Sequence, residues 1–457
     1  SPQLVMLFGS FGSLLSTFAL LALALQGCDT SQSPSTTTST TPSSPGKARQ
    51  ASQVITVPGW PDIHGKFPLS FAVKAGSLVY ASGMQGMDMR TMKLVEGGVK
   101  EETKQILENL MVLLKVANSS LDHVTMCSVS LTDITRDFGA FNEAYAAFWP
   151  NAKPARIAVQ VAALAGNASV EIQCNAALSD KTVSTVTPPR FPAVSLPLSW
   201  ATKVDGMVYA SGTQGFDFTT GKMAEGGIQN ETTQALENIH AILKAADSDA
   251  GKVVACSVSL TNMSDFAEMN EAYKAFWPAK AAIGGLPTRV CVEVAALAGT
   301  GKVEIQCVAA GADVPGDDPK AVKVPGWPEM TGFPFSAAAT ADGIAFISGN
   351  QGVDMKTSKL VSGGAGPETT QTLKDIQEAA EASGTGLNEV VACEVSLKDM
   401  KDFSEMNEAY ANFWPSEPPS RVAVQVGSLA RDASIEIRCM AAIPPHKHLP
   451  NQDQLVI

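Results

Sequence analysis

The chain contains the same set of motifs three times, and this repetition limits its fold more than any other feature. LVYASGMQGMD at 78–88 recurs as MVYASGTQGFD at 207–217 and as IAFISGNQGVD at 344–354. FNEAYAAFWP, ARIAVQVAALAG and SVEIQC each have two near copies later in the chain. Corresponding residues lie between 129 and 137 positions apart, which is the length of a whole domain rather than of a short solenoid motif.

We therefore divide the 457 residues into three repeats and two terminal segments. The parts are a signal-like apolar segment with a Ser/Thr/Pro-rich linker (1–50), repeat 1 (51–182), repeat 2 (183–315), repeat 3 (316–445) and a C-terminal tail (446–457).

Each repeat is predicted to be an α+β domain of order β-β-α-β-α-β-β, and repeat 1 illustrates the pattern. Apolar residues at helical spacing predict a helix near 102–117, and 124–131 is predicted as a strand. A second helix is predicted to begin near Asp133, and alternating strands follow at 156–164 and 169–177. The aromatic stripe of the second helix is interpreted as core between helix and sheet: Phe138, Phe141, Tyr145 and Phe148.

The composition argues against two classes of function. A net charge of −12 and an isoelectric point near 5.0, with no Lys/Arg run longer than two, do not suit a nucleic-acid surface. Only five histidines are present, so metal sites and triads built on histidine are not expected. We expect no nucleic-acid partner, no metal and no cofactor.

The N-terminal segment suggests targeting rather than catalysis. Leu4 to Leu25 is a mostly apolar run long enough to span a bilayer, and Thr30 to Ser44 is almost all Ser, Thr and Pro. A cleaved secretory signal, a membrane anchor and a two-part plastid or other organelle targeting sequence all fit this pattern. The sequence thus favours these locations over the cytosol and leaves membrane association through the N-terminus open.

An Arg and a Glu recur 15 residues apart in every repeat. The pairs are Arg156/Glu171, Arg289/Glu304 and Arg421/Glu436. If the two strands that carry them are antiparallel neighbours, the side chains fall close together within one repeat. A guanidinium suits capture of a carboxylate, and a nearby carboxylate can position or deprotonate water. From the spacing alone, a plain salt bridge or two unrelated surface charges is the favoured explanation.

The order SG-x-Q-G, NEAY, R-x-x-V-x-V and VEI, three times over, resembles the RidA/YjgF (Rid) family. The resemblance covers about 390 of the 457 residues. It implies a chorismate-mutase-like fold and a trimer with a site in each cleft between neighbours. Three copies in one chain would then form a single-chain pseudo-trimer, and the chain would be monomeric.

The resemblance implies hydrolysis of reactive 2-enamine and 2-imine carboxylic acids, such as 2-aminoacrylate and 2-iminopropanoate, to 2-keto acids and ammonia. The chain would be a hydrolase acting on C–N bonds, similar to 2-iminobutanoate/2-iminopropanoate deaminases. The alternative is a non-catalytic, small-carboxylate-binding or regulatory module on the same fold.

Site residues are carried over by position. The three Arg would bind the substrate carboxylate, and Glu171, Glu304 and Glu436 would orient the attacking water. Backbone N–H groups of Gly83, Gly212 and Gly349 would lie beside the carboxylate, with the preceding Ser82, Ser211 and Ser348 adjacent. Asn142, Asn270 and Asn407 match an Asn near the pocket, although capping or packing is an equally good role for them.

The sequence departs from the family pattern at three places. The pocket Tyr of the family is replaced by Leu69, Leu198 and Phe335. A Cys two residues after the Arg remains only as Cys291, which we include among the expected substrate-binding residues. Repeat 2 also has five additional residues between its FWP motif and Arg289, which could reshape or disable that site.

Six of the eight cysteines recur in pairs: Cys127/Cys174, Cys256/Cys307 and Cys393/Cys439. Buried thiols are the favoured interpretation, because free Cys is among the most buried residue types. If the chain enters the secretory route, one disulfide in each repeat becomes the alternative.

Overall fold

The computed structural model describes residues 49–445, apart from residues 50, 65, 193–194, 278–282, 315–318 and 329–331. All of these residues belong to the unit Gly46–Ile457, which separates by its internal contacts from Ser1–Pro45. The expected apolar N-terminal segment and the C-terminal tail lie outside the described residues, as do residues 278–282 in the lengthened connection before Arg289. Within the described ranges, no helix has both the length and the apolarity needed to cross a bilayer.

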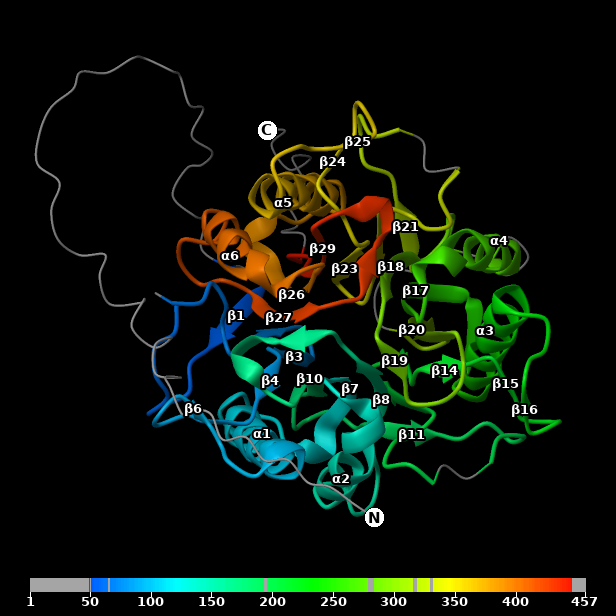
Figure 1. Cartoon of the computed structure of the whole chain (residues 1–457), viewed down its shortest axis with the longest axis horizontal. Helices are drawn as coiled ribbons and strands as arrows, with labels where there is room; N and C mark the ends of the chain where they lie inside the picture. The colour runs from blue at the N-terminus through cyan, green and yellow to red at the C-terminus, as the bar shows by residue number, and fades with distance from the viewer. Residues whose placement is uncertain are drawn as a thin grey trace, which may run out of the picture. The chain divides into compact units, whose positions relative to one another are not determined.

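The three repeats share one order of elements, coloured blue to cyan, green, and yellow to red in Figure 1. Repeat 1 contains β1 (Ser52–Ile55), β2 (Ala72–Ala75), β3 (Leu78–Ala81), β4 (Met84–Gln85), β5 (Met87–Asp88), β6 (Lys93–Leu94), α1 (Gly98–Val116), β7 (Val124–Leu131), α2 (Ile134–Ala146), β8 (Ala155–Gln160), β9 (Ala163–Leu164) and β10 (Val170–Ala177). Repeat 2 contains β11 (Ser184–Val186), β12 (Ala201–Val204), β13 (Met207–Ala210), β14 (Thr213–Gln214), β15 (Phe216–Asp217), β16 (Lys222–Met223), α3 (Ile228–Ala245), β17 (Ser248–Leu260), α4 (Phe266–Phe276), β18 (Thr288–Glu293), β19 (Ala296–Leu297) and β20 (Val303–Gly311).

Repeat 3 contains β21 (Lys320–Val322), β22 (Ala338–Ala341), β23 (Ile344–Ile347), β24 (Val353–Asp354), β25 (Lys359–Leu360), α5 (Ala365–Ala382), β26 (Val390–Leu397), α6 (Phe403–Ala411), β27 (Ser420–Gln425), β28 (Ser428–Leu429) and β29 (Ile435–Ala442). The predicted order of two strands, helix, strand, helix and two strands is thus found in each repeat, with a few very short strands added. The expected α+β class is confirmed.

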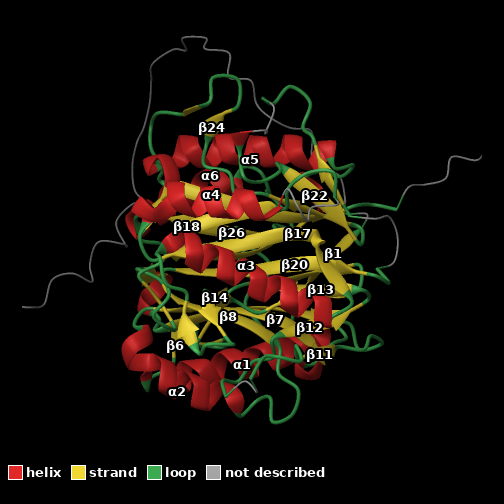
Figure 2. Ribbon diagram, turned by 90° about the vertical axis from the view of Figure 1, so that its right-hand side faces the viewer, coloured by secondary structure: helices red, strands yellow, loops and turns green. Residues whose placement is uncertain are grey.

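Each repeat packs its two helices on one face of its sheet. On α1, Ile106, Leu110 and Leu113 are buried at the spacing of a single helix face. Gly97 precedes this helix with φ of +112°, a backbone angle that side-chain-bearing residues rarely adopt. The resulting helix-to-sheet cores are separate, one for each repeat, and Figure 2 shows the helices covering the strands.

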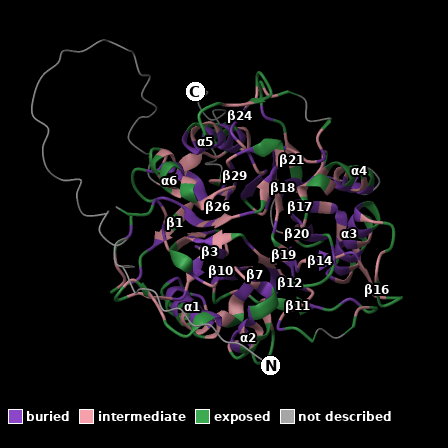
Figure 3. Cartoon of the chain, in the orientation of Figure 1, coloured by how far each residue is buried: buried purple, intermediate pink, exposed green. Residues whose placement is uncertain are grey.

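The opposite faces of the three sheets meet in one further core. Tyr80 of repeat 1, Tyr209 of repeat 2 and Phe346 of repeat 3 belong to the same buried cluster. Figure 3 colours these inner strands mostly as buried. Because this core draws on all three repeats, a single repeat taken alone would expose an apolar face.

The sheets are also joined through strand exchange. Each ends in a two-residue strand from another repeat: β19 pairs with β8, β28 with β18 and β9 with β27. Repeat 2 thus adds to the sheet of repeat 1, repeat 3 to that of repeat 2, and repeat 1 to that of repeat 3. The exchange is cyclic, which confirms the expected single-chain pseudo-trimer.

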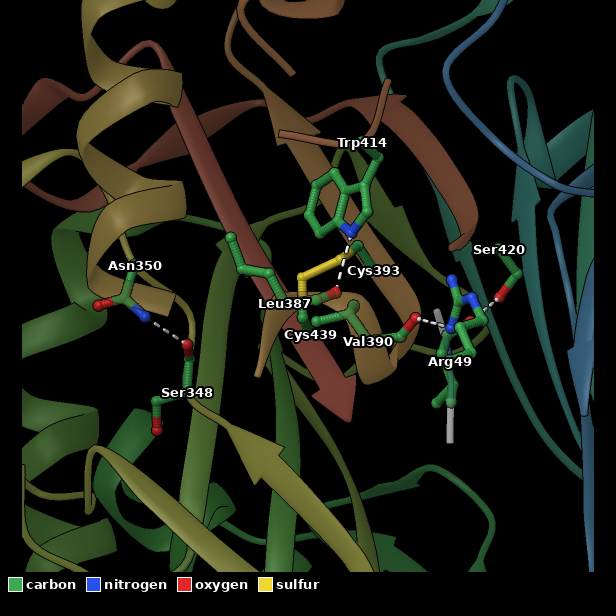
Figure 4. The surroundings of a disulfide bond; sticks show 10 residues. Arg49, Ser348, Asn350, Leu387, Val390, Cys393, Trp414, Ser420 and Cys439 are labelled. Carbon is green, nitrogen blue, oxygen red and sulfur yellow. Dashed lines mark hydrogen bonds between the residues drawn. A yellow bond between two sulfur atoms is a disulfide. The ribbon is translucent and has the colours of Figure 1, made fainter. Parts of the chain in front are cut away.

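The paired cysteines form disulfides, which corrects the favoured expectation of free thiols. Bonds join Cys127 to Cys174, Cys256 to Cys307 and Cys393 to Cys439, with Cα atoms 4.2 Å apart in each case. The two cysteines of each pair stand directly opposite one another on neighbouring antiparallel strands. That register brings the sulfur atoms together without any movement of the backbone. Figure 4 shows the third bond, beside Trp414, whose indole N–H donates to the carbonyl of Leu387.

Candidate active site at the junctions between repeats

Within one repeat, the recurring Arg and Glu do not meet. Strand β8, which carries Arg156, runs parallel to β7, and β10, which carries Glu171, lies on the other side of β7. Arg156 is level with Cys127 and Glu171 is level with Ser130. The prediction that β8 and β10 are antiparallel neighbours is therefore wrong. The connection from β7 to β8 runs through a helix, so β8 pairs in parallel with β7, and β7 lies between β8 and β10.

Each Arg instead faces the next repeat. We define site A as Arg421 with Ser82, Gly83 and Glu171; site B as Arg156 with Ser211, Gly212 and Glu304; and site C as Arg289 with Ser348, Gly349 and Glu436. The same members approach one another at all three junctions. Every site thus takes its guanidinium from one repeat and its carboxylate from another.

A serine hydroxyl joins the two repeats at each site. In site A, Ser82 Oγ accepts from the backbone N–H of Arg421 at 2.8 Å and donates to the carbonyl of Ser70 at 2.5 Å. Ser211 and Ser348 make the same pair of bonds. The hydroxyl proton and one of the two oxygen lone pairs thus connect the two repeats, and the expected contact of this serine with the substrate stays a prediction.

The glycine after each serine also differs from expectation. The N–H groups of Gly83, Gly212 and Gly349 donate to the carbonyls of Arg421, Arg156 and Arg289 at 3.0–3.1 Å. They are thus engaged by the backbone of the neighbouring repeat and do not point at an open carboxylate position. What the site requires of these glycines is their lack of a side chain: a Cβ on Gly83 would lie 2.1 Å from Oε1 of Glu171.

The guanidiniums are buried, and among the described residues no carboxylate is hydrogen-bonded to them. The exposed fractions of Arg156, Arg289 and Arg421 are 2%, 4% and 2%. Their recorded side-chain hydrogen bonds go to neutral groups, and Nε of Arg156 and of Arg421 is buried without a partner in the described structure. Burial lowers the pKa of Arg156 and of Arg421 from the usual value. A buried, unpaired cation of this kind is costly and gains from binding an anion.

Aromatic rings hold each guanidinium in place. Cζ of Arg156 lies 5.8, 5.4 and 5.1 Å from the ring centres of Phe138, Phe141 and Tyr145. Phe266 and Tyr273 surround Arg289, and Phe403 and Tyr410 surround Arg421, in the same way. The stripe that sequence analysis interpreted as core therefore also forms the cation–π surroundings of the site.

The asparagines orient the Arg in two of the three sites. Oδ1 of Asn142 accepts from the guanidinium of Arg156 at 2.8 Å, and Oδ1 of Asn270 accepts from Arg289 at 2.6 Å. In site A, Oδ1 of Asn407 is buried without a hydrogen-bond partner in the described residues, and Arg421 instead contacts Sδ of Met406. The first two asparagines thus position the cation directly.

The glutamates are the second ionisable component. Glu171, Glu304 and Glu436 are 5–6% exposed, and burial raises the pKa of each to about 7, against the lowering effect of a Gln hydrogen bond and of the facing Arg. Near neutral pH such a carboxyl group can both accept and return a proton. Glu171 also lines a partly open cavity of about 110 Å³, whose lining residues come from all three repeats and include none of the three site arginines.

Sequence analysis missed one recurring residue. Nε2 of Gln85 donates to Oε2 of Glu171 at 2.8 Å, and Gln214 and Gln351 make the same bond to Glu304 and Glu436 at 3.3 and 2.8 Å. The motif SG-x-Q-G contains this Gln in all three repeats, so the repetition itself was the available signal.

Site C differs from the other two. The Phe335 ring of repeat 3 lies 5.2 Å from Cζ of Arg289, where sites A and B have Leu69 and Leu198 at the corresponding sequence positions.

Cys291 is buried in the apolar core of repeat 2, and burial raises the pKa of its thiol to about 12. Its thiol is therefore protonated at neutral pH, and its expected contact with the substrate stays a prediction. Among the described residues, no group of three His, Cys, Asp or Glu side chains is placed to hold a metal ion.

The fold and the repeated site place the chain in a known class of proteins. A sequence model of the family described as endoribonuclease L-PSP matches residues 63–178, 190–311 and 329–443. The chain belongs to this family and contains three copies of its domain. This confirms the relationship that the motifs indicated.

Individual relatives match one repeat at a time. The mouse protein named 2-iminobutanoate/2-iminopropanoate deaminase is 40% identical over 129 residues, which is 28% of this chain and 90% of that protein. The Arabidopsis thaliana protein named reactive intermediate deaminase A, chloroplastic, is 38% identical over 24% of this chain and 59% of its own length. The crystal structure of RidA from an Antarctic Psychrobacter is 40% identical, covering 28% of this chain and 99% of that one, with a TM-score of 0.26.

Proposed function

We propose that the chain hydrolyses 2-imino and 2-enamine carboxylic acids to 2-keto acids and ammonia at the junctions between its repeats. The observation that carries the proposal is a buried guanidinium with no carboxylate bonded to it, facing a carboxyl group whose pKa is about 7. The first group suits the substrate carboxylate, and the second suits a water molecule. The names of the mouse and Arabidopsis relatives support the same chemistry.

The proton balance fits one carboxyl group for each site. The ionised Glu accepts a proton from water as the water oxygen bonds to the imine carbon. The same proton is then returned to nitrogen, which gives a carbinolamine. The carboxylate next takes the proton of the new hydroxyl group and transfers it to nitrogen, so that the C=O bond forms, the C–N bond breaks and ammonia leaves the keto acid. Since a free imine is already electrophilic, holding the water and the substrate together can supply much of the rate.

The test is the decay of a 2-imino acid that an amino-acid oxidase generates in the presence of the full chain. Arg156→Lys, Arg289→Lys and Arg421→Lys keep the charge but remove the planar fork, so we expect the triple variant to lose about 10- to 150-fold in rate, or about 1.5–3 kcal/mol. Arg190→Lys, at an exposed residue, is the control and leaves the rate unchanged. A folded triple variant with the full rate would disprove the site.

A carboxylate-binding module is the second candidate. Leu69, Leu198 and Phe335 stand where the resemblance places a pocket Tyr, which favours binding without turnover. Calorimetric binding of a 2-keto acid that depends on the three Arg, together with an imine decay rate equal to that of buffer, would favour this candidate over the deaminase.

A further inference from the structure

The cross-strand pair of Gln and Glu extends the site beyond the residues discussed so far. In repeat 1, Gln85 on β4 stands directly opposite Glu171 on β10, and in repeat 2, Gln214 stands opposite Glu304. Directly opposed residues of an antiparallel pair project from the same face of the sheet. In repeat 3, Asn350 forms an isolated bridge to Ile437, which brings the adjacent Gln351 level with Glu436.

In repeat 2, the hydrogen bond made by the amide oxygen of Gln214 fixes the orientation of its amide group. Oε1 of Gln214 accepts from the backbone N–H of Gly301 at 3.1 Å. Because the amide oxygen is used there, the amide nitrogen is the group that faces Glu304. In repeat 1, Oε1 of Gln85 likewise faces the turn at Gly166, where an added Cβ would lie 3.6 Å away.

The two oxygens of each carboxylate therefore have different surroundings. Oε2 accepts from the Gln amide in every site. Oε1 lies against the neighbouring glycine, where a Cβ on Gly83, Gly212 or Gly349 would approach within 2.0–2.1 Å. The N–H groups of these glycines donate to the carbonyl of the Arg in the neighbouring repeat. Oε1 is therefore the carboxylate oxygen that lies nearer to the junction between the two repeats.

We infer that Gln85, Gln214 and Gln351 are positioning residues, which hold Oε2 of each glutamate so that Oε1 is the oxygen that exchanges a proton with water. The inference rests on the proposed function in one respect, that the reaction is imine hydrolysis. The choice of Oε1 over Oε2 rests on the geometry alone. Three independent repeats of one chain have the same arrangement, so it is not an accident of one loop.

The variant that tests this role is Gln85→Leu combined with Gln214→Leu and Gln351→Leu in the full chain. The matched control is Gln105→Leu with Gln234→Leu and Gln371→Leu, because these helix glutamines also each donate one side-chain bond, four residues along the chain. If the Leu variant does not fold, Gln→Met at the same three positions replaces it, since Met has the length of Gln and no amide.

Without the Gln amide, the ionised carboxylate loses a hydrogen bond that stabilises it, so the pKa of the glutamate rises. We expect the acid limb of the kcat/KM profile to move upward by about one pH unit in the site variant, and kcat/KM at pH 7 to fall about 5-fold. The control keeps both the limb and the rate. An unmoved limb, or an equal change in the control, would overturn the positioning role.

A second measurement does not need activity. In protein labelled with carbon-13 at the glutamate carboxyl carbon, the three signals that Glu171→Gln, Glu304→Gln and Glu436→Gln remove can be titrated by NMR. The Leu variant should raise all three titration midpoints, and unchanged midpoints would overturn the inference. If the unsubstituted chain clears no imine, the proposed reaction fails; the titration still decides whether Gln holds Oε2.

Discussion

The carboxyl groups of Glu171, Glu304 and Glu436 lie where burial disfavours their charged form. Each has its pKa raised to about 7 from the ordinary glutamate value of 4.5. Since the proposed mechanism needs the ionised form, activity must be lost as pH falls through this value. The facing Arg and the bonded Gln limit the rise of the pKa but do not cancel it.

We predict that kcat/KM for imine hydrolysis has a single acid limb near pH 7 and a plateau above it. Protonation removes the base below the limb, and the guanidinium stays charged on both sides of it. The measurement is the rate of imine decay from pH 5.5 to pH 9, corrected for spontaneous hydrolysis at each pH. A rate that instead rises with acidity would assign the opposite role, general acid, to the carboxyl group.

The glycine beside each carboxylate gives a steric prediction. In Gly212→Ala the new Cβ would lie 2.1 Å from Oε1 of Glu304, so the carboxylate must move. We expect site B to lose most of its activity, which lowers the total rate by about one third if the three sites are equal. The control is Gly139→Ala on α2, where no atom lies within 4 Å of the added Cβ. Equal effects of the two changes would show that the close approach is not important for function.

At the scale of elements, neighbouring strands determine which residues can meet. Strands β7 and β10 place the first pair of cysteines in register, and β7 also separates β8, which carries Arg156, from β10, which carries Glu171. The sequence shows that these residues recur but not which strands are neighbours. The site therefore depends on topology more than on spacing.

We predict that the three strand-to-strand disulfides are formed in the purified protein. After denaturation without reductant, Cys291 should react with an alkylating reagent and the six paired cysteines should not. Reduction should add six alkyl groups by intact mass and lower the thermal midpoint, because each bond restricts the unfolded chain. Cys291→Ala, which removes no bond, controls for the loss of a buried sulfur. Six reactive thiols before reduction would contradict the pairing.

Much of the fold could be predicted because repetition averages out local ambiguity. The order of elements in the repeats and the importance of Arg and Glu follow from motifs that occur three times. The partner of each Arg could not be predicted, because Arg156 and Glu171 are 15 positions apart in sequence, whereas Arg156 and Glu304 meet through the junction of two repeats. The aromatic surroundings of the Arg could not be predicted either, because Phe141 and Tyr145 are equally consistent with plain core packing.

At the scale of the whole molecule, one junction has no covalent linker. Repeats 1 and 2, and repeats 2 and 3, follow one another in the chain, whereas repeats 3 and 1 meet only through contacts. Arg49 lies at this third junction and donates to the carbonyl of Val390 at 2.9 Å (Figure 4). It also donates to the carbonyl of Glu417 at 2.9 Å. Glu389 accepts from the N–H of Ala51 and from the hydroxyl of Ser52 at the same place.

We predict that residues 46–445 form a monomer with the mass of one chain, and that Arg49→Ala loosens the third junction. Losing two or three hydrogen bonds from this half-buried cation should cost about 2–4 kcal/mol locally, which makes the segment around residues 51–56 more sensitive to limited proteolysis. The exposed Arg190→Ala is the control. Light scattering checks the mass, and a mass of three chains would contradict the intramolecular arrangement.

The cyclic exchange of strands has a consequence for inheritance. When three identical subunits assemble, one mutation appears in every site at once, so a harmful change cannot be tested by selection in a single site. Here each site is encoded by its own pair of segments in one gene, and two intact sites can protect the organism while the third changes. Phe335 beside Arg289 is the kind of difference that such an arrangement can preserve.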